Sequence, residues 1–256
     1  MINQIRADFY RQIHTTGMYI MLVLTIIYAA TTTLGQSVGG VTVRGDSGQF
    51  AQVGGKSWSV LTGIKVANMG ETMLLYVFIG VFVMVFGYEF SQKVYKNTLI
   101  SGISRLAFVL AKYLVMLLDL LLLFAVNFLT VLMAGLVAGR PLGGSLGTLF
   151  GTFSLSFVAA TFFVSVIFSI GVFLLVLTGS IMIPAIVVVV FPLIVSVLHV
   201  LGEWDWIKYI DFFGVAQNIG VGGMKVSALP PYIAVSLVLL VVMIGSSALI
   251  LRNKEL

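Results

Sequence analysis

Long apolar runs dominate this sequence and leave it few folds to adopt. Hydrophobic residues make up 60% of the 256 residues and charged residues only 9%. A soluble domain carries about 25% charged residues, so this chain has too few charged side chains to form a surface exposed to water on all sides. The runs long enough to cross a bilayer as helices are 17–35, 71–88, 108–138, 148–178, 180–201 and 231–251. The sequence therefore predicts one all-α membrane domain over residues 1–256, with six transmembrane helices.

Six spans put both chain ends on one side of the membrane, and the basic residues indicate which side. With the ends inside, the inner segments hold Arg6, Arg11, Lys93, Lys96, Arg105, Lys112, Arg252 and Lys254. The outer segments then hold Arg44, Lys56, Lys65, Arg140, Lys208 and Lys225. The inner segments are much shorter in total, so their density of basic residues is higher, as is typical of cytoplasmic loops. We expect an N-in, C-in topology.

Three segments outside the spans have patterns of their own. In residues 1–16, at 100° per residue, one apolar face opposes a polar one: Ile2, Ile5, Phe9 and Ile13 against Gln4, Asp8 and Arg11. That pattern predicts a helix lying in the membrane interface. Residues 36–70 are expected to form an outer polar loop. Residues 202–230 mix Trp and Phe with acidic residues, which is typical of an amphipathic segment at the outer membrane–water boundary.

Composition and spacing exclude several functions. Cysteine is absent, and the two histidines, His14 and His199, lie far apart, so we expect no metal site. Gly55-Lys56-Ser57 resembles the end of a phosphate-binding loop, but Phe50 occupies the position that needs glycine. The chain is therefore expected to hold no ATP site, no cofactor and no catalytic residues. The basic residues sit at span ends rather than in a patch, which argues for contact with membrane lipid and against nucleic acid.

One acidic residue, Asp119, is expected well inside a span. At 100° steps it lies about 20° from Lys112 on the same helix face, and Asn127 is displaced by about 80° from Asp119. Charge inside a membrane is costly and is often functional. Asp119 and Asn127 are therefore candidate residues of a translocation path. The alternative is structural, with Asp119 paired to a polar group of a neighbouring helix or to a lysine. A single carboxylate and no visible internal repeat argue against an ion-coupled carrier.

Residues 89–107 form the one substantial polar break between spans. They carry several basic residues against the single acid Glu89, so we expect a cytoplasmic loop. The stretch YKNTLISGISR, together with Glu89 before it and Lys112 after it, resembles the loop between the second and third spans of bacterial type-two ABC exporter permeases. The closest likeness is to the antimicrobial-peptide and antibiotic export and immunity branch. Many relatives have proline where this chain has Gly102.

The resemblance implies that this loop forms a coupling helix, which docks on a separate cytoplasmic ATPase subunit. The residues that it assigns to coupling are Glu89, Lys93, Tyr95, Lys96, Asn97, Thr98, Ser101, Gly102, Ser104 and Arg105. It also implies an N-terminal elbow helix and short re-entrant helices within 202–230. The alternative is that the loop is only a charge-anchored connection between spans.

The same resemblance implies an assembly in the bacterial plasma membrane. Two permease chains, identical or different, would combine with two ATPase chains that bind ATP and Mg²⁺. The expected activity is export of an amphiphilic peptide or antibiotic, for secretion or self-protection. Alternatives are the same machine with a lipid, polysaccharide or small-drug cargo, or an ATPase-independent membrane carrier or scaffold.

Overall fold

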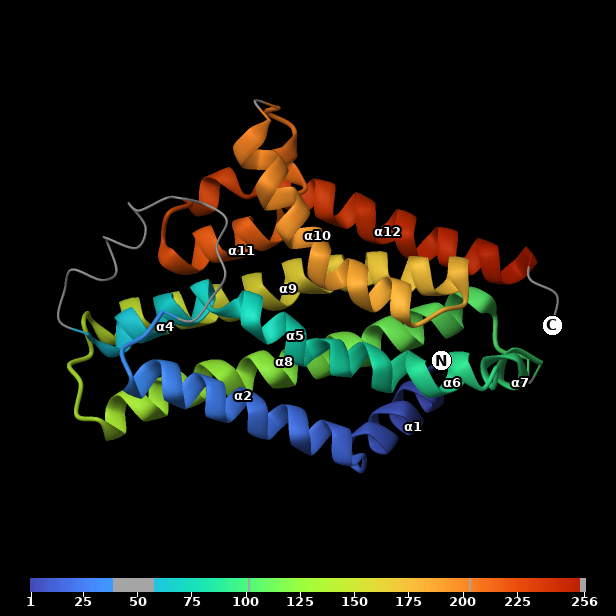
Figure 1. Cartoon of the computed structure of the whole chain (residues 1–256), viewed down its shortest axis with the longest axis horizontal. Helices are drawn as coiled ribbons and strands as arrows, with labels where there is room; N and C mark the ends of the chain where they lie inside the picture. Colours follow the sequence, from blue (N-terminus) through green and yellow to red (C-terminus); the bar gives the residue numbers. More distant parts are fainter. Residues whose placement is uncertain (39–57, 101, 203, 254–256) are drawn as a thin grey trace.

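The computed structural model describes residues 1–38, 58–100, 102–202 and 204–253 (Figure 1). Within these ranges the regular structure is entirely helical, so the prediction of an all-α chain is confirmed. The elements are α1 (Ile2–Ile13), α2 (Thr16–Leu34), α4 (Val60–Met69), α5 (Glu71–Phe82), η1 (Val83–Gly87), α6 (Tyr88–Ser91), α7 (Tyr95–Ile100), α8 (Arg105–Val137), α9 (Leu146–Thr178), α10 (Met182–Leu201), η2 (Ile207–Tyr209), α11 (Phe212–Val221), η3 (Val226–Ala228) and α12 (Pro230–Asn253). Gly55, Lys56, Ser57 and most of the expected outer loop lie outside the described residues.

In the described part of the chain, five helices are long and apolar enough to cross a membrane. They are Thr16–Leu34, Arg105–Val137, Leu146–Thr178, Met182–His199 and Pro230–Arg252. Each lies within a few residues of an expected apolar span, because an uninterrupted apolar run of this length fixes a helix almost by itself. These helices indicate a multi-pass membrane protein.

The segment expected to be the second span differs from the prediction. Residues 60–69, placed in the outer loop by sequence, form the helix α4, and α5 with η1 continues from it after a bend of 62°. Ser59 caps α4, its hydroxyl accepting a hydrogen bond from Thr62 N at 3.1 Å. Val60, Ile64 and Ala67 on one face of α4 are buried. If the bent pair counts as one span, the number of candidate spans rises to six.

The long helices α8 and α9 form the centre of the bundle (Figure 1). Helices α1, α2 and α4 pack against α8, whereas α10, α11 and α12 pack against α9. Helix α9 carries apolar residues on nearly every face, which is typical of a helix enclosed by neighbours on most sides. Ser104 and Ser145 cap the first turns of α8 and α9 through hydrogen bonds of 3.2 Å to Ala107 N and Thr148 N.

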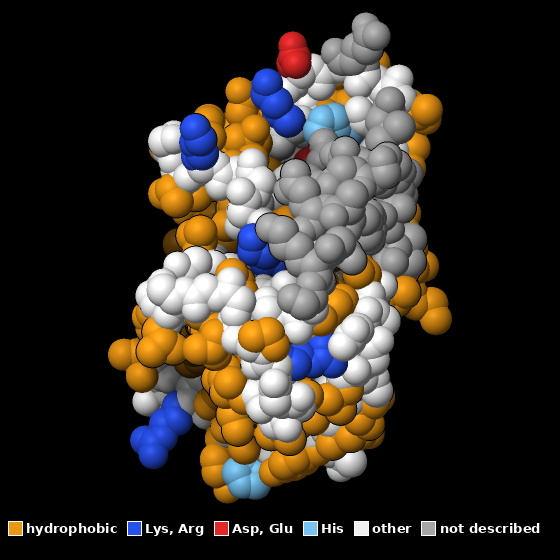
Figure 2. All heavy atoms as spheres, turned by 90° about the vertical axis from the view of Figure 1, so that its left-hand side faces the viewer, with side chains coloured by type: hydrophobic (Ala, Val, Ile, Leu, Met, Phe, Trp, Pro, Cys, Tyr) orange, Lys and Arg blue, Asp and Glu red, His pale blue; other side chains and the backbone are white. Residues whose placement is uncertain are grey.

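The two ends of the bundle differ. Helices α6 and α7, the beginning of the chain and the last turns of α12 lie together at one end (Figure 1). Helix α4 and the turn between α8 and α9 lie at the opposite end. Figure 2 looks on to this opposite end, where Lys and Arg side chains are scattered singly rather than gathered into one patch. The bundle therefore places the 89–107 loop, α1 and the C-terminal end of α12 at a common end (Figure 1).

Candidate functional site

The 89–107 loop folds into a short helix held between two sharp turns. Lys93, before α7, has a left-handed backbone with φ of 55°, and Gly102, after α7, has φ of 94°. Glycine adopts a positive φ without steric cost, whereas proline is locked near −65°. Proline in place of Gly102 could therefore not adopt this turn.

Helix α7 is anchored by one face and open on the other. Leu99 is buried, and the Tyr95 ring stacks on Phe90 with 4.6 Å between ring centroids. On the outer side, Asn97 is exposed and Ile100 is 67% exposed. The face of α7 that carries Asn97 and Ile100 is therefore open, whereas the face that carries Leu99 and Tyr95 is packed.

The structure separates the residues assigned to coupling into three groups. Lys93, Asn97, Gly102 and Ser104 are exposed, whereas Tyr95, Lys96, Thr98 and Arg105 are half-buried. Ser101 lies outside the described residues. Glu89 is buried and points into the bundle, so its predicted part in coupling depends on the residues that it contacts there.

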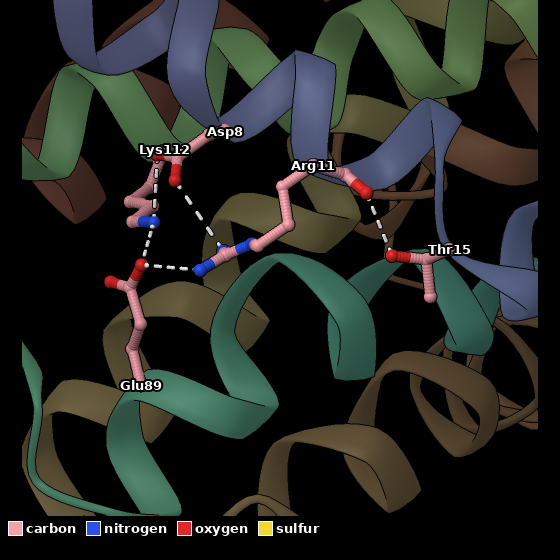
Figure 3. Close-up of polar contacts among 5 residues, drawn as sticks. All are labelled: Asp8, Arg11, Thr15, Glu89 and Lys112. Carbon is pink, nitrogen blue, oxygen red and sulfur yellow. Dashed lines mark hydrogen bonds and ion pairs between the residues drawn. The ribbon is translucent and has the colours of Figure 1, made fainter.

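Glu89 enters a buried network of ion pairs centred on Lys112 (Figure 3). The Lys112 ammonium is fully buried and donates to Asp8 Oδ2 at 2.7 Å and to Glu89 Oε1 at 2.6 Å. Arg11 joins both acids, at 3.4 Å from Asp8 Oδ1 and 3.3 Å from Glu89 Oε1. Two bases thus balance two acids, and such pairing is what permits charges to be buried.

The network joins three parts of the chain that are distant in sequence. Asp8 and Arg11 come from α1, Glu89 from α6 at the start of the loop, and Lys112 from the second turn of α8. At the end of α1 the Thr15 hydroxyl donates to the Arg11 carbonyl oxygen at 2.8 Å, which fixes the corner towards α2 (Figure 3). Movement of α6 is therefore mechanically connected to α1 and α8.

Helix α1 turns its polar face towards the bundle. Its buried residues are Asp8 and Gln12, one helical turn apart, whereas Ile2 is 77% exposed and Ile13 is also exposed. The apolar positions that predicted a helix at the membrane interface thus lie partly on the outside. The polar positions, which the sequence left without a partner, contact α8.

Asp119 is fully buried on the face of α8 that carries Lys112, two helical turns further along the helix. With the Gln12 amide assigned so that its nitrogen faces the acid, Gln12 donates to Asp119 Oδ1 at 2.8 Å and also to Oδ2. Its partner is thus a polar group on a neighbouring helix, as in the structural interpretation of this residue. Asn127 is buried as well, and neither of its amide atoms has a hydrogen-bond partner within the described part of the chain.

Replacing Gln12 by leucine is expected to lower the unfolding free energy by about 1–2 kcal/mol, because Asp119 would lose its donor while staying buried. Denaturant unfolding of the purified chain in detergent micelles measures the change. The double replacement of Gln12 and Asp119 by leucine should recover most of the loss, because no polar group is then left unpaired. Equal stability of Gln12→Leu and the unaltered chain would show that the two side chains do not interact.

The surroundings of the buried acids were predicted only in part. Lys112 and Asp119 were correctly expected on one face of a helix, but their partners Asp8 and Gln12 were missed. The matching signal was present, because Asp8 and Gln12 also share a face. Asp119 was also expected to be the one acid well inside a span. The structure buries a further acid, Glu71, which is 1% exposed at the α4–α5 bend.

No model of a known protein family matches the chain, and no curated protein matches it either. The functional assignment therefore depends on the residues of the loop, the network beneath it and the helical architecture.

Proposed function

We propose that the chain is the membrane-spanning permease subunit of an ATP-driven ABC exporter. The observation that carries this proposal is the position of Glu89. It stands where the exposed loop begins, and it is tied by short ion pairs to a buried lysine of the central helix α8. A surface loop that only connected two spans would need no such buried connection, which costs desolvation of every charge in it.

In the proposed mechanism the loop transmits force. An ATPase docks against the outer side of α7, with Ile100 and Asn97 in the contact. Closure of the ATPase pair on ATP and Mg²⁺ pushes α7 and α6. The Glu89–Lys112–Asp8 ion pairs then carry the displacement to α8 and α1, because packed and ion-paired elements move as units. The chain itself contributes no group to ATP hydrolysis.

The surrounding assembly follows from the same resemblance. Two permease chains, identical or different, would pair with two ATPase chains in a bacterial plasma membrane. In this arrangement both chain ends lie inside with the loop, and the common end shared by α7, α1 and the last turns of α12 supports their placement on one side (Figure 1). The proposed cargo is an amphiphilic peptide or antibiotic. A lipid, polysaccharide or small drug is the alternative cargo of the same machine.

A charged residue at the tip of α7 should strongly weaken partner binding without unfolding the chain. Ile100→Glu is expected to reduce the recovery of a nucleotide hydrolase by about 30-fold, the loss typical of an interface hot spot. The measurement is a pull-down of the tagged chain from its native membrane. Ile100 is exposed in the isolated chain, so the fold should tolerate the change. Val226→Glu is the matched control, because Val226 is 64% exposed on η3.

Two results would overturn the proposal. One is a pull-down of the unaltered chain that contains no nucleotide hydrolase. The other is equal recovery of the hydrolase with Ile100→Glu and with the control.

The bend between α4 and α5 favours a second candidate function, that of an ATPase-independent carrier. Broken helices with a buried carboxylate are typical of ion-coupled transporters, and Glu71 lies at such a break. Reconstitution of the purified chain alone separates the two candidates. Cargo movement in vesicles without nucleotide or ATPase supports the carrier, whereas movement only with both supports the exporter.

A further inference from the structure

Glu71 occupies an unusual place, at the break of a bent helix pair and away from the ion-pair network. It is the first residue of α5, directly after Gly70, where the helix axis turns by 62°. Only 1% of its surface is exposed, and neither carboxyl oxygen has a hydrogen-bond partner within the described residues. Almost all buried polar groups in proteins have such a partner, so an acid with none requires an explanation.

Two side-chain donors at the break are committed to backbone carbonyl oxygens. The Tyr28 hydroxyl of α2 donates to the Gly70 carbonyl oxygen at 3.0 Å, and Gln217 of α11 donates through Nε2 to the Met69 carbonyl oxygen at 3.2 Å. The Gly70 carbonyl oxygen also accepts from Met73 N at 3.1 Å. Neither of these side-chain donors is bonded to Glu71, whose carboxyl oxygens have no hydrogen-bond partner among the described residues.

The neighbouring amide of Asn68 shows the same imbalance. Its Nδ2 donates to the Ile64 carbonyl oxygen at 2.8 Å and to Ser156 Oγ at 3.1 Å. Its Oδ1 is buried and accepts no hydrogen bond from any described residue. Buried acceptor oxygens on both sides of Gly70 thus lack a donor among the described residues, a pattern that suits a site for a positively charged species.

No described basic side chain neutralises Glu71. The titratable side chains on the elements that pack around α5 are Tyr19 and Tyr28 on α2, Lys65 on α4, Arg105, Lys112, Tyr113 and Asp119 on α8, and His199 on α10. Lys112 is paired with Asp8 and Glu89, and His199 lies 3.6 Å from Asp211. The Lys65 ammonium lies towards α11, 3.8 Å from the position that a Cβ on Gly222 would occupy.

We propose that the α4–α5 break is a proton-binding site, with the Glu71 carboxyl as the group that holds the proton. A buried carboxylate without a cation nearby neutralises itself by taking a proton from water. The added proton bonds to one carboxyl oxygen, and the resulting hydroxyl supplies the donor that the site lacks. Opening of the junction between α4, α5 and α11 to water releases the proton, so each opening and closing exchanges one proton per chain.

Infrared spectroscopy of the full-length chain in lipid nanodiscs, without any ATPase, tests the proposal. Labelling with ¹³C-glutamate identifies the carbonyl band of a protonated glutamic acid. We expect this band at neutral pH in the unaltered chain, its loss as the pH is raised, and its absence in Glu71→Gln. Glu89→Gln is the matched control: Glu89 is also buried but ion-paired with Lys112, so the band should persist there. Gel filtration confirms that each variant is folded.

Three results would overturn the proposal. They are the absence of a glutamic acid band from the unaltered chain at neutral pH, an unchanged band in Glu71→Gln, and loss of the band on addition of Na⁺ or K⁺ at constant pH. The last would identify a metal-cation site instead. Since no ATPase is present, each of these outcomes is independent of whether the chain serves an ABC exporter.

Discussion

Replacing Lys112 by methionine is expected to lower the unfolding free energy by about 3–5 kcal/mol, the cost of removing one partner from a buried ion pair. Methionine matches much of the volume of lysine but removes the ammonium that touches both Asp8 and Glu89. The two acids would then share only Arg11, whose side chain is 41% exposed. Denaturant unfolding in mixed micelles, followed by circular dichroism, measures the loss.

Two further variants separate the network from general effects of losing a lysine. Lys225→Met removes an exposed lysine next to η3 and should leave stability unchanged. The triple variant Asp8→Asn, Glu89→Gln and Lys112→Met should recover most of the stability, because the network then keeps only the charge of Arg11, whose side chain is 41% exposed. If Lys112→Met unfolds at the same denaturant concentration as the unaltered chain, the network contributes nothing to the fold.

Replacing Gly220 by leucine is expected to cost about 3 kcal/mol or more, by overpacking and by breaking a buried hydrogen bond. A Cβ on Gly220 would overlap the Asn68 side chain, so α11 approaches α4 as closely as glycine allows. Asn68 would have to move away from Ser156, to which it donates a hydrogen bond. The same unfolding measurement in micelles detects this loss.

Gly245 provides the matched control, because a Cβ there would meet nothing within 4 Å. Gly245→Leu in α12 should unfold like the unaltered chain or be slightly more stable, since leucine favours a helix more than glycine does. Adding Asn68→Ala to Gly220→Leu should restore part of the loss by making room. Equal stability of the Gly220 and Gly245 variants would contradict the close packing of α11 on α4.

The sequence predicted the apolar helices well and the bent one poorly. For α8 and α9 an unbroken apolar run was sufficient, because only a helix satisfies the backbone inside a membrane. Helix α4 and its bend into α5 were missed because Lys65, Asn68 and Glu71 interrupt the apolar run, although the span over 71–88 was expected. Asn68 and Glu71 are buried by contacts between helices, which no local pattern predicts.

The candidate site was likewise predicted in part. The 89–107 loop was chosen as the candidate site from its charge and from its resemblance to the loop of a known family. In the structure its short helix lies between two sharp turns. The position of Glu89 was not foreseen, because its partners belong to α1 and α8. Sequence spacing placed Lys112 and Asp119 on one face of α8, but nothing local showed that Asp8 and Gln12 would lie against them.

The lengths of α8 and α9 have a consequence for the surrounding lipid. Each has 33 residues, about 50 Å at 1.5 Å per residue, whereas the hydrocarbon layer is about 30 Å thick. Both helices must lean or extend past the acyl chains. Lys112 lies seven residues into α8, about 10 Å from its start. The thickness of the host bilayer thus decides whether the ion pairs of Lys112 lie among headgroups or among acyl chains. The strength of these ion pairs depends on which of the two surrounds them.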